Sequence, residues 1–286
     1  MSGTLYLIPT PIGNLEDITL RAVRILREVD LIACEDTRHT RKLLSHFDIH
    51  TPTLSYHEHN ERDRVNRLLS DLQSGKSVAI VSDAGMPGIS DPGAVIVQAA
   101  VEAGCPVTAL PGACAVPTAL AASGLNTEQF LFAGFLPVKQ GARRQALEGL
   151  RDLSATLVFY EAPHRLLAFL EDALLVLGNR PAVVARELSK QFEEYVRLPL
   201  KEQIAHFMHQ EPRGEMVILI AGKSQDVQTE PLSPRLTLRE DMERLIAGGI
   251  SPNAAMKQLS QKYGVAKREL YRQWQEEKDQ ADEVTR

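Results

Sequence analysis

Short apolar runs alternate with amphipathic stretches through the first part of the chain. The apolar runs are bounded by polar residues, Gly or Pro, as buried strands are, and the amphipathic stretches have helical spacing. The predicted strands are Thr4–Ile8, Asp30–Cys34, Thr51–Ser55, Val78–Val81 and Val107–Leu110. The predicted helices are Thr19–Arg27, Thr40–Phe47, one bearing Leu68, Leu69 and Leu72, then Ala94–Ala103 and Val116–Ala122. This alternation predicts an α/β fold, with a mostly parallel sheet covered by helices on both faces.

A second group of elements begins near Gly124. Its predicted strands are Phe130–Phe135, Ala155–Tyr160, Ala182–Arg186, Glu194–Leu198 and Met216–Ala221, and its helices are one ending near Leu150, Pro163–Val176 and Glu202–Met208. Apolar and polar residues alternate along Glu194–Leu198, which is typical of a half-exposed antiparallel strand. We therefore expect a second α/β domain with a mixed sheet.

The pattern changes after the last strand. Residues Lys223–Pro234 are polar and contain two prolines, which predicts a linker. Helices are then predicted over Leu238–Ala247, Asn253–Lys262 and Ala266–Gln275, separated by glycine-containing turns in a helix-turn-helix-like arrangement. The predicted domains are 1–122, 123–224 and a linker with a small helical domain over 225–286.

The segment Ser82–Gly93 follows a predicted buried strand and precedes a predicted helix. An open α/β sheet binds ligands at such strand–loop–helix junctions, and the glycines allow positive φ and close approach of the backbone. Asp83 stands at the end of the strand, where a carboxylate can meet a ligand's cation or hydroxyls. We expect Asp91 to cap the helix and Pro92 to lie in its first turn. The alternative is an ordinary turn between strand and helix.

Composition narrows the function classes. The formal net charge of −5 over 286 residues provides no global positive field for nucleic acid, so a polyanion would need a local basic patch. The cysteines Cys34, Cys105 and Cys114 stand in or beside apolar runs, which predicts buried, reduced thiols. No leader or membrane-spanning stretch is evident, so we expect a cytoplasmic protein.

Familiar nucleotide and hydrolase motifs are missing, since the chain has no G-x-x-x-x-G-K-[ST], G-x-G-x-x-G or G-x-S-x-G. The string His57-Glu58-His59 has no second ligand cluster at standard spacing, so we expect no metal, and the string is either the polar rim of a cleft or a solvated loop. In Pro111–Ala113, before a helix, the backbone N–H groups of Gly112 and Ala113 could cradle an adenosine or a carboxylate, or the segment could simply form a tight turn.

Several strings together resemble the tetrapyrrole methylase superfamily over about residues 4 to 222. They are Leu5–Leu15, the Asp83 loop, Pro111–Ala113 and Gly214–Val217. The resemblance implies two α/β domains with S-adenosylmethionine in the cleft between them. Tetrapyrrole enzymes of the family carry G-D-P where this chain has Ser82-Asp83-Ala84, which argues against a tetrapyrrole substrate.

Three longer strings, Ser82–Gly93, Tyr160–Arg165 and Arg186–Lys190, resemble the branch of the family that 2′-O-methylates a cytidine of 16S rRNA in the small ribosomal subunit. That resemblance implies direct in-line methyl transfer and a homodimer. Two alternatives stay open. One is a methylase of a small acidic substrate such as a tetrapyrrole, and the other is a nucleic-acid-binding regulator with a vestigial enzyme body.

The resemblance suggests the candidates for cofactor binding and for the base, and the need for local positive charge suggests those for RNA binding. Those expected to bind the cofactor are Pro9, Asp83, Gly85, Met86, Ile89, Ser90, Ala113, Phe132 and Ala185. Candidates for the catalytic base are Glu58, His59 and Glu187. Candidates for RNA binding are Arg38, Arg41, Lys42, Asn60, Arg62, Lys139, Arg143, Arg144 and Arg165. The tail adds Lys257, Lys262, Lys267, Arg268 and Arg272, and it either docks on RNA or forms a helical cap with Leu245, Leu259, Leu270 and Trp274 as its core.

Overall fold

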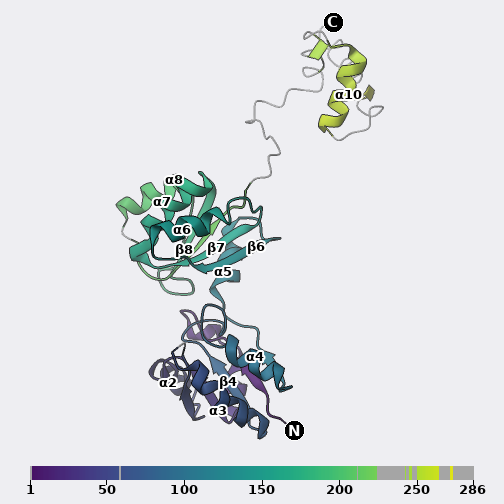
Figure 1. The fold of residues 1–286 in the computed structure, drawn as a ribbon. Coiled ribbons are helices and arrows are strands. Elements are labelled where there is room, and N and C mark those ends of the chain that lie inside the picture. Colours follow the sequence, from purple (N-terminus) through teal and green to yellow (C-terminus); the bar gives the residue numbers. More distant parts are fainter. Residues whose placement is uncertain are drawn as a thin grey trace. The chain divides into compact units, whose positions relative to one another are not determined.

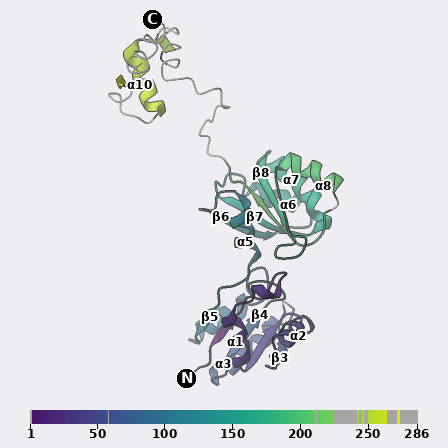
Figure 2. The same ribbon diagram turned by 180° about the vertical axis from the view of Figure 1, so that it is seen from behind.

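The computed structural model describes residues 2–57, 59–210, 212–223, 242, 245–246, 250–263 and 271–272. The chain divides into two compact units, Met1–Gln225 and Asp226–Arg286 (Figures 1 and 2). Each is described here by itself.

The first sheet of the larger unit is entirely parallel. Its strands are β1 (Leu5–Leu7), β2 (Leu31–Cys34), β3 (Thr53–Ser55), β4 (Val78–Val81) and β5 (Val107–Ala109), in the order β3-β2-β4-β1-β5. The four residues of β4 are all buried and face the two sides of the sheet alternately. The apolar run Val78–Val81 therefore became the central strand of the sheet, as a strand buried on both faces does.

Helices cover both faces of this sheet. On one face, α1 (Leu20–Glu28) and α2 (Thr37–His46) pack against Ile32, Ala79 and Val81. On the other, α3 (Glu61–Gln73) and α4 (Ala94–Glu102) pack against Leu5, Val78 and Ile80. A short 3₁₀ helix, η1 (Leu15–Asp17), precedes α1. The mostly parallel, two-sided arrangement predicted from the alternation is confirmed.

The second sheet is mixed, as the alternation along Glu194–Leu198 predicted. Its strands are β6 (Phe130–Phe135), β7 (Thr156–Glu161), β8 (Pro181–Arg186), β9 (Glu194–Pro199) and β10 (Met216–Ile220). Their order is β6-β7-β10-β8-β9, in which β6 and β7 run parallel and every other pair is antiparallel. The last described strand of the chain, β10, is therefore the central strand of this sheet, between β7 and β8.

This second sheet also lies between two helical layers. Helices α6 (Gln140–Glu148), α7 (Leu166–Leu177) and α8 (Leu200–His209) share one core with Leu157 and Phe159, and Figures 1 and 2 show the three together on one side. Helix α5 (Ala115–Ser123) packs on the opposite face against Val158, Val217 and Leu219. A 3₁₀ turn, η2 (Pro163–Arg165), leads into α7.

The smaller unit contains α10 (Pro252–Tyr263). Leu259 and Leu245, two of the expected core residues, pack in a small apolar cluster with Met242, Ala255 and Met256. Leu270 and Trp274, the linker and most of the third predicted helix lie outside the described residues, so the helix-turn-helix arrangement stays a prediction.

Two local expectations differ from the structure. Helix α2 begins at Thr37 instead of Thr40, because the Asp36 carboxylate accepts a hydrogen bond from the Arg38 N–H at 2.8 Å and caps the helix there. Asp91 does not cap α4. Gly93 occupies the N-cap position of α4 with a φ of +143°, and no side chain, that of Asp91 included, caps the helix.

The three thiols are free, with Cys34 and Cys105 buried and Cys114 partly exposed.

Across the described part of the chain, no helix combines the length and apolar character that crossing a membrane requires.

Candidate functional site

A pocket of about 540 Å³ lies where loops from both sheets of the larger unit meet. The first sheet contributes the loop after β4, from Asp83 to Asp91, and Ile12 from the loop after β1. The second sheet contributes Tyr160–Pro163 at the end of β7, Glu187, Leu188 and Lys190 after β8, and Gly214–Val217 at the start of β10. This volume lies within the range of about 300–1,000 Å³ that suits a small-molecule ligand.

Backbone hydrogen bonds hold the loop after β4 in place. Thr10 and Gly85 exchange two N–H···O bonds of 2.9 Å each, and the Ser82 hydroxyl donates to the Gly85 carbonyl oxygen at 2.9 Å. Gly85 has a φ of +85°, which glycine adopts without the penalty of a side chain. Hydrogen bonds to the neighbouring loop after β1 therefore hold the pocket loop in this conformation.

Carboxylates concentrate at the β2 and β4 side of the pocket. Asp83 Oδ1 accepts a hydrogen bond from the Asp36 backbone N–H at 3.2 Å, which joins the start of α2 to the pocket loop. Burial raises the pKa of Asp91 to about 6, and the nearby charges of Glu35 and Asp83 add to the effect. Asp91 thus exchanges its proton much closer to neutral pH than an ordinary Asp does.

The opposite wall contains a strained turn after β8. Glu187 and Ser189 both have positive φ, +52° and +64°. Glu187 Oε1 accepts hydrogen bonds from Lys190 Nζ at 3.0 Å and from the Glu215 N–H at 3.1 Å. Burial raises the pKa of Glu187, but the bonds from Lys190 and Glu215 outweigh that effect and the net shift is downward. Strained residues held by several contacts cluster at functional sites.

The predicted cofactor residues fall into two groups. Asp83, Gly85, Met86, Ile89 and Ser90 all line the pocket. Pro9, Ala113, Phe132 and Ala185 lie outside its lining. Phe132 stacks edge-on against the lining residue Tyr160 with ring centroids 4.9 Å apart, and Ala185 pairs across the sheet with the lining residue Val217. These two therefore support the wall from behind.

Among the candidates for the base, Glu187 lines the pocket and His59 does not. His59 is exposed, and its ring centroid lies 6.0 Å from that of His57. Glu58 lies outside the described residues. In the described part of the chain, no cluster of three or more Asp, Glu, His or Cys side chains is arranged to hold a metal ion.

Several RNA candidates stand on the surface. Arg38 has a side chain 85% exposed and pairs with Asp36 at 2.9 Å, and the exposed residues Arg41, Lys42, Arg62 and Lys139 share that surface character. Asn60 instead holds its own turn, accepting from the His57 N–H at 2.9 Å and donating to the Ser55 carbonyl oxygen at 3.3 Å.

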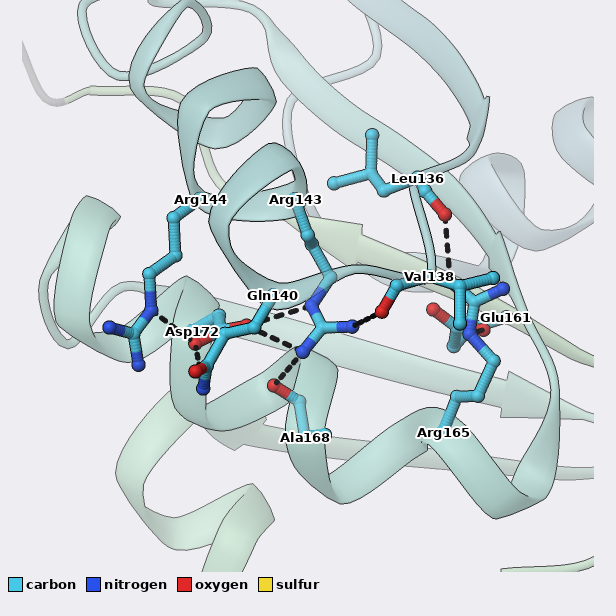
Figure 3. A network of polar contacts seen from close by, with 9 residues as sticks. All are labelled: Leu136, Val138, Gln140, Arg143, Arg144, Glu161, Arg165, Ala168 and Asp172. Carbon is cyan, nitrogen blue, oxygen red and sulfur yellow. Dashed lines mark hydrogen bonds and ion pairs between the residues drawn. The ribbon is translucent and has the colours of Figure 1, made fainter.

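Arg143, Arg144 and Arg165 belong to a polar network beside the second sheet, in which Arg143 is buried and Arg144 is partly exposed (Figure 3). Arg143 is only 4% exposed and its Nε donates to Asp172 Oδ2 at 2.8 Å, while Arg144 Nε donates to Asp172 Oδ1 at 2.6 Å. Arg165 pairs with Glu161 at 3.0 Å. These contacts give Arg143 and Arg165 roles inside the fold, and we do not retain these two as surface contacts for RNA.

Among the lining residues that sequence reasoning did not name as individual candidates are Tyr160, Glu161, Lys190 and Glu215, although each stands in a string that carries the family resemblance. Glu161 is 2% exposed, and burial raises its pKa. Besides the resemblance of the string Tyr160–Arg165, its position at the end of an apolar strand was a signal, because a lone acid is expensive to bury there unless it is paired.

Two α/β halves, each supplying strand-end loops to one pocket, define a class of fold shared with known methylases. The family model for Tetrapyrrole (Corrin/Porphyrin) Methylases matches residues 4–203, and the chain belongs to this family. Among solved structures, the fold is similar to that of cobalt precorrin-4 methyltransferase, with a TM-score of 0.56 and 20% identity over 76% of this chain and 94% of that one. Diphthine synthase gives a TM-score of 0.60 and 15% identity over 77% of this chain and 90% of that one.

Curated relatives are much more similar in sequence. The chain is 49% identical to the protein named "Ribosomal RNA small subunit methyltransferase I" of Halalkalibacterium halodurans, over 96% of both chains. It is 48% identical to the protein of the same name from Synechocystis sp., over 94% of this chain and 96% of that one. Coverage this high includes most of the segment after residue 225.

Proposed function

We propose that the chain is an S-adenosylmethionine-dependent methyltransferase that 2′-O-methylates a cytidine of 16S rRNA in the small ribosomal subunit. The observation that carries the proposal is the 45–49% identity, over 94–96% of the chain, to proteins named for methylation of small-subunit ribosomal RNA. The choice of ribose oxygen and of cytidine rests on the resemblance of Ser82–Gly93, Tyr160–Arg165 and Arg186–Lys190 to that branch of the family. A cytoplasmic homodimer forms part of the same proposal.

The pocket suits such a cofactor in both shape and chemistry. Ile12, Met86 and Leu188 provide apolar walls against which the faces of an adenine ring can pack. Asp83 and Asp91 place carboxylates beside them, where a cationic sulfonium and ribose hydroxyls find acceptors. Gly85, with positive φ, allows the backbone close to the ligand.

The bound cofactor supplies an activated methyl group, and the chain contributes position and proton transfer. Bringing the two reactants into attack geometry is worth about 7–11 kcal/mol. The ribose hydroxyl must also lose its proton, and a base is most effective when its pKa lies near the working pH. Asp91, with a pKa of about 6, meets this condition better than Glu187, whose pKa is lowered. We add Asp91 to the candidates Glu58, His59 and Glu187.

The RNA would be held by exposed cations. Arg38, Arg41 and Lys42 lie on α2, whose first turn is joined to the pocket by the bond from Asp36 to Asp83. Phosphate contacts of this kind give affinity that falls with salt. Lys257 on α10 is exposed, which is consistent with RNA docking by the tail.

A methylase of a small tetrapyrrole is the second candidate, because the family model and the cobalt precorrin-4 methyltransferase fold point to that substrate class. Ser82 and Ala84 beside Asp83 depart from the pattern of those enzymes. The identity to solved structures of the fold, 15–21%, is also far below that to the ribosomal relatives.

The test offers three acceptors side by side, with radiolabelled S-adenosylmethionine: small ribosomal subunits from a strain lacking this enzyme, free 16S rRNA, and uroporphyrinogen. Label on subunits or free rRNA supports the proposal. Label on uroporphyrinogen alone supports the second candidate. A chain ending at residue 224 should keep its cofactor affinity and lose RNA affinity if the tail docks on RNA, and unchanged RNA affinity would make the tail a structural cap.

A further inference from the structure

A second cavity of about 580 Å³ adjoins the main pocket. The described residues that line it are Arg186, Glu187, Phe192, Gln210, Arg213 and Gly214. Glu187 and Gly214 also line the main pocket, so the two cavities share a wall. A Cβ added at Gly214 would clash with Glu187 Oε1, so the Glu187 carboxylate fills the space beside Gly214 in this shared wall.

Phe192 is presented to solvent by an ordered turn. It is 68% exposed, although a large aromatic side chain is usually at least partly covered. The turn that bears it is closed by bonds from the Lys190 N–H to the Glu187 carbonyl oxygen at 3.0 Å and from the Glu193 N–H to the Lys190 carbonyl oxygen at 3.2 Å. The exposure is therefore built into the fold and is not caused by fraying.

The side chains around Phe192 are of the kinds that bind an unpaired nucleobase. Single-stranded RNA is bound by stacking bases on aromatic rings and guanidinium planes, with amide and guanidinium groups meeting base edges and phosphates. Phe192 provides the ring, Arg213 is an exposed cation at the rim, and the Gln210 amide ends α8 at the same cavity. Arg186 is held by Glu194 at 2.5 Å, which fixes its guanidinium as part of the wall.

We propose that this second cavity receives a base of the RNA adjacent to the target nucleotide, unstacked from its neighbours and stacked on Phe192. The inference rests on the proposed function, because a ribose delivered to the main pocket brings its neighbouring nucleotides to the shared wall at Glu187 and Gly214. Phe192 would then position the substrate, and the ligand of the second cavity would be single-stranded RNA.

Kinetics with three variants test the role of Phe192. Stacking of one base contributes about 1–3 kcal/mol, so Phe192→Ala should raise the KM for small subunits about 5- to 150-fold. It should leave kcat within about twofold and cofactor affinity by calorimetry unchanged, since Phe192 does not line the main pocket. Phe192→Tyr retains a ring and should behave like the wild type. Phe130→Ala is the matched control, because Phe130 is 47% exposed and lines neither cavity.

A KM for Phe192→Ala within twofold of the wild type would overturn the inference. A second readout does not depend on activity. Photoreactive p-benzoylphenylalanine at position 192 should cross-link to 16S rRNA in small subunits. Cross-linking to a ribosomal protein alone, or none at all, would overturn the inference. A cross-link to RNA, with no methyl transfer to subunits or free rRNA by the wild-type protein, would refute the proposed function and with it the assignment of the base as a neighbour of the target nucleotide.

Discussion

Replacing Asp172 with Asn should be among the most damaging single changes in the second sheet's layer of helices. The Asp172 carboxylate is fully buried on α7 and accepts from both Arg143, at 2.8 Å, and Arg144, at 2.6 Å (Figure 3). Gln140 adds a bond of 3.3 Å. Asn preserves the shape of the side chain, removes its charge and replaces one of the two acceptor oxygens with an NH₂ donor, so it cannot accept from both arginines.

The expected loss in free energy of unfolding follows from the burial of Arg143, the partner of Asp172. The Arg143 side chain is 5% exposed, and without the Asp172 carboxylate no described ion-pair partner balances its charge: it keeps the neutral carbonyl oxygens of Val138 at 3.1 Å and Ala168 at 3.4 Å and at most the one amide oxygen of the substituted side chain. A buried charge that loses its partner costs about 3–5 kcal/mol. The Arg144 side chain is 41% exposed, so its pairing adds little. Against a typical stability of about 5–15 kcal/mol, Asp172→Asn removes a large share.

Urea denaturation followed by far-ultraviolet circular dichroism measures this loss. Tryptophan fluorescence does not serve here, because the single Trp is Trp274 in the C-terminal segment. The matched control is Glu171→Gln, an exposed carboxylate on the same helix, which should change the free energy of unfolding by less than about 0.5 kcal/mol. The double variant Arg143→Met with Asp172→Leu should recover much of the loss, since it leaves no charge buried. A free energy of unfolding for Asp172→Asn within about 1 kcal/mol of the wild type would refute this reasoning.

Three further predictions concern the pocket. The pKa of Asp91 is raised from 3.8 to about 6 in the folded state, so ionisation of Asp91 lowers the free energy of unfolding as the pH rises from about 4 to 6. The loss is at most about 3 kcal/mol, before it is reduced by solvent screening. In urea titrations, Asp91→Asn should therefore be more stable than the wild type above pH 7 and not below pH 4. Asp83→Asn keeps an acceptor for the Asp36 N–H and should weaken cofactor binding about 10- to 150-fold in calorimetry with an unchanged melting temperature; unaltered affinity would remove Asp83 from the cofactor site. Gly214→Ala places a Cβ against the Glu187 carboxylate and should lower the rate of methyl transfer. The control is Gly104→Ala, which has a similar φ of +70° and open space around it and should only reduce stability. Equal methyl-transfer activities of the two variants would show that Glu187 need not stay in place.

The architecture was largely predictable because local patterns and tertiary packing agree. Val78–Val81 is apolar on both faces and became the central strand, and the alternation along Glu194–Leu198 identified an antiparallel strand. The early start of α2 was missed because Asp36 follows the strand almost directly and caps the helix from there. The cap expected at Asp91 was wrong because the backbone reaches α4 through Gly93 at a φ of +143°.

Apart from Glu187, the predicted residues that line the pocket are neighbours in sequence. Asp83 to Ser90 all come from one loop, whereas Glu161, Lys190 and Glu215 meet in the pocket through the pairing of β7, β10 and β8. Arg143 was mistaken for a surface cation because its partner lies 29 residues away. A signal existed, since Asp172 shares the buried face of α7 with Phe169, Ala173 and Val176. An acid on such a face requires a buried cation somewhere in the fold.

Location of the transferred methyl group tests the central claim most directly. Small ribosomal subunits from a strain lacking the enzyme are labelled with radioactive S-adenosylmethionine, and the 16S rRNA is then hydrolysed in alkali. A methyl group on a ribose 2′-oxygen blocks cleavage of the adjoining phosphodiester, so the label should appear in an alkali-resistant dinucleotide whose 5′ nucleoside is cytidine. Label released as a single methylated nucleotide would place the methyl group on a base and contradict the account.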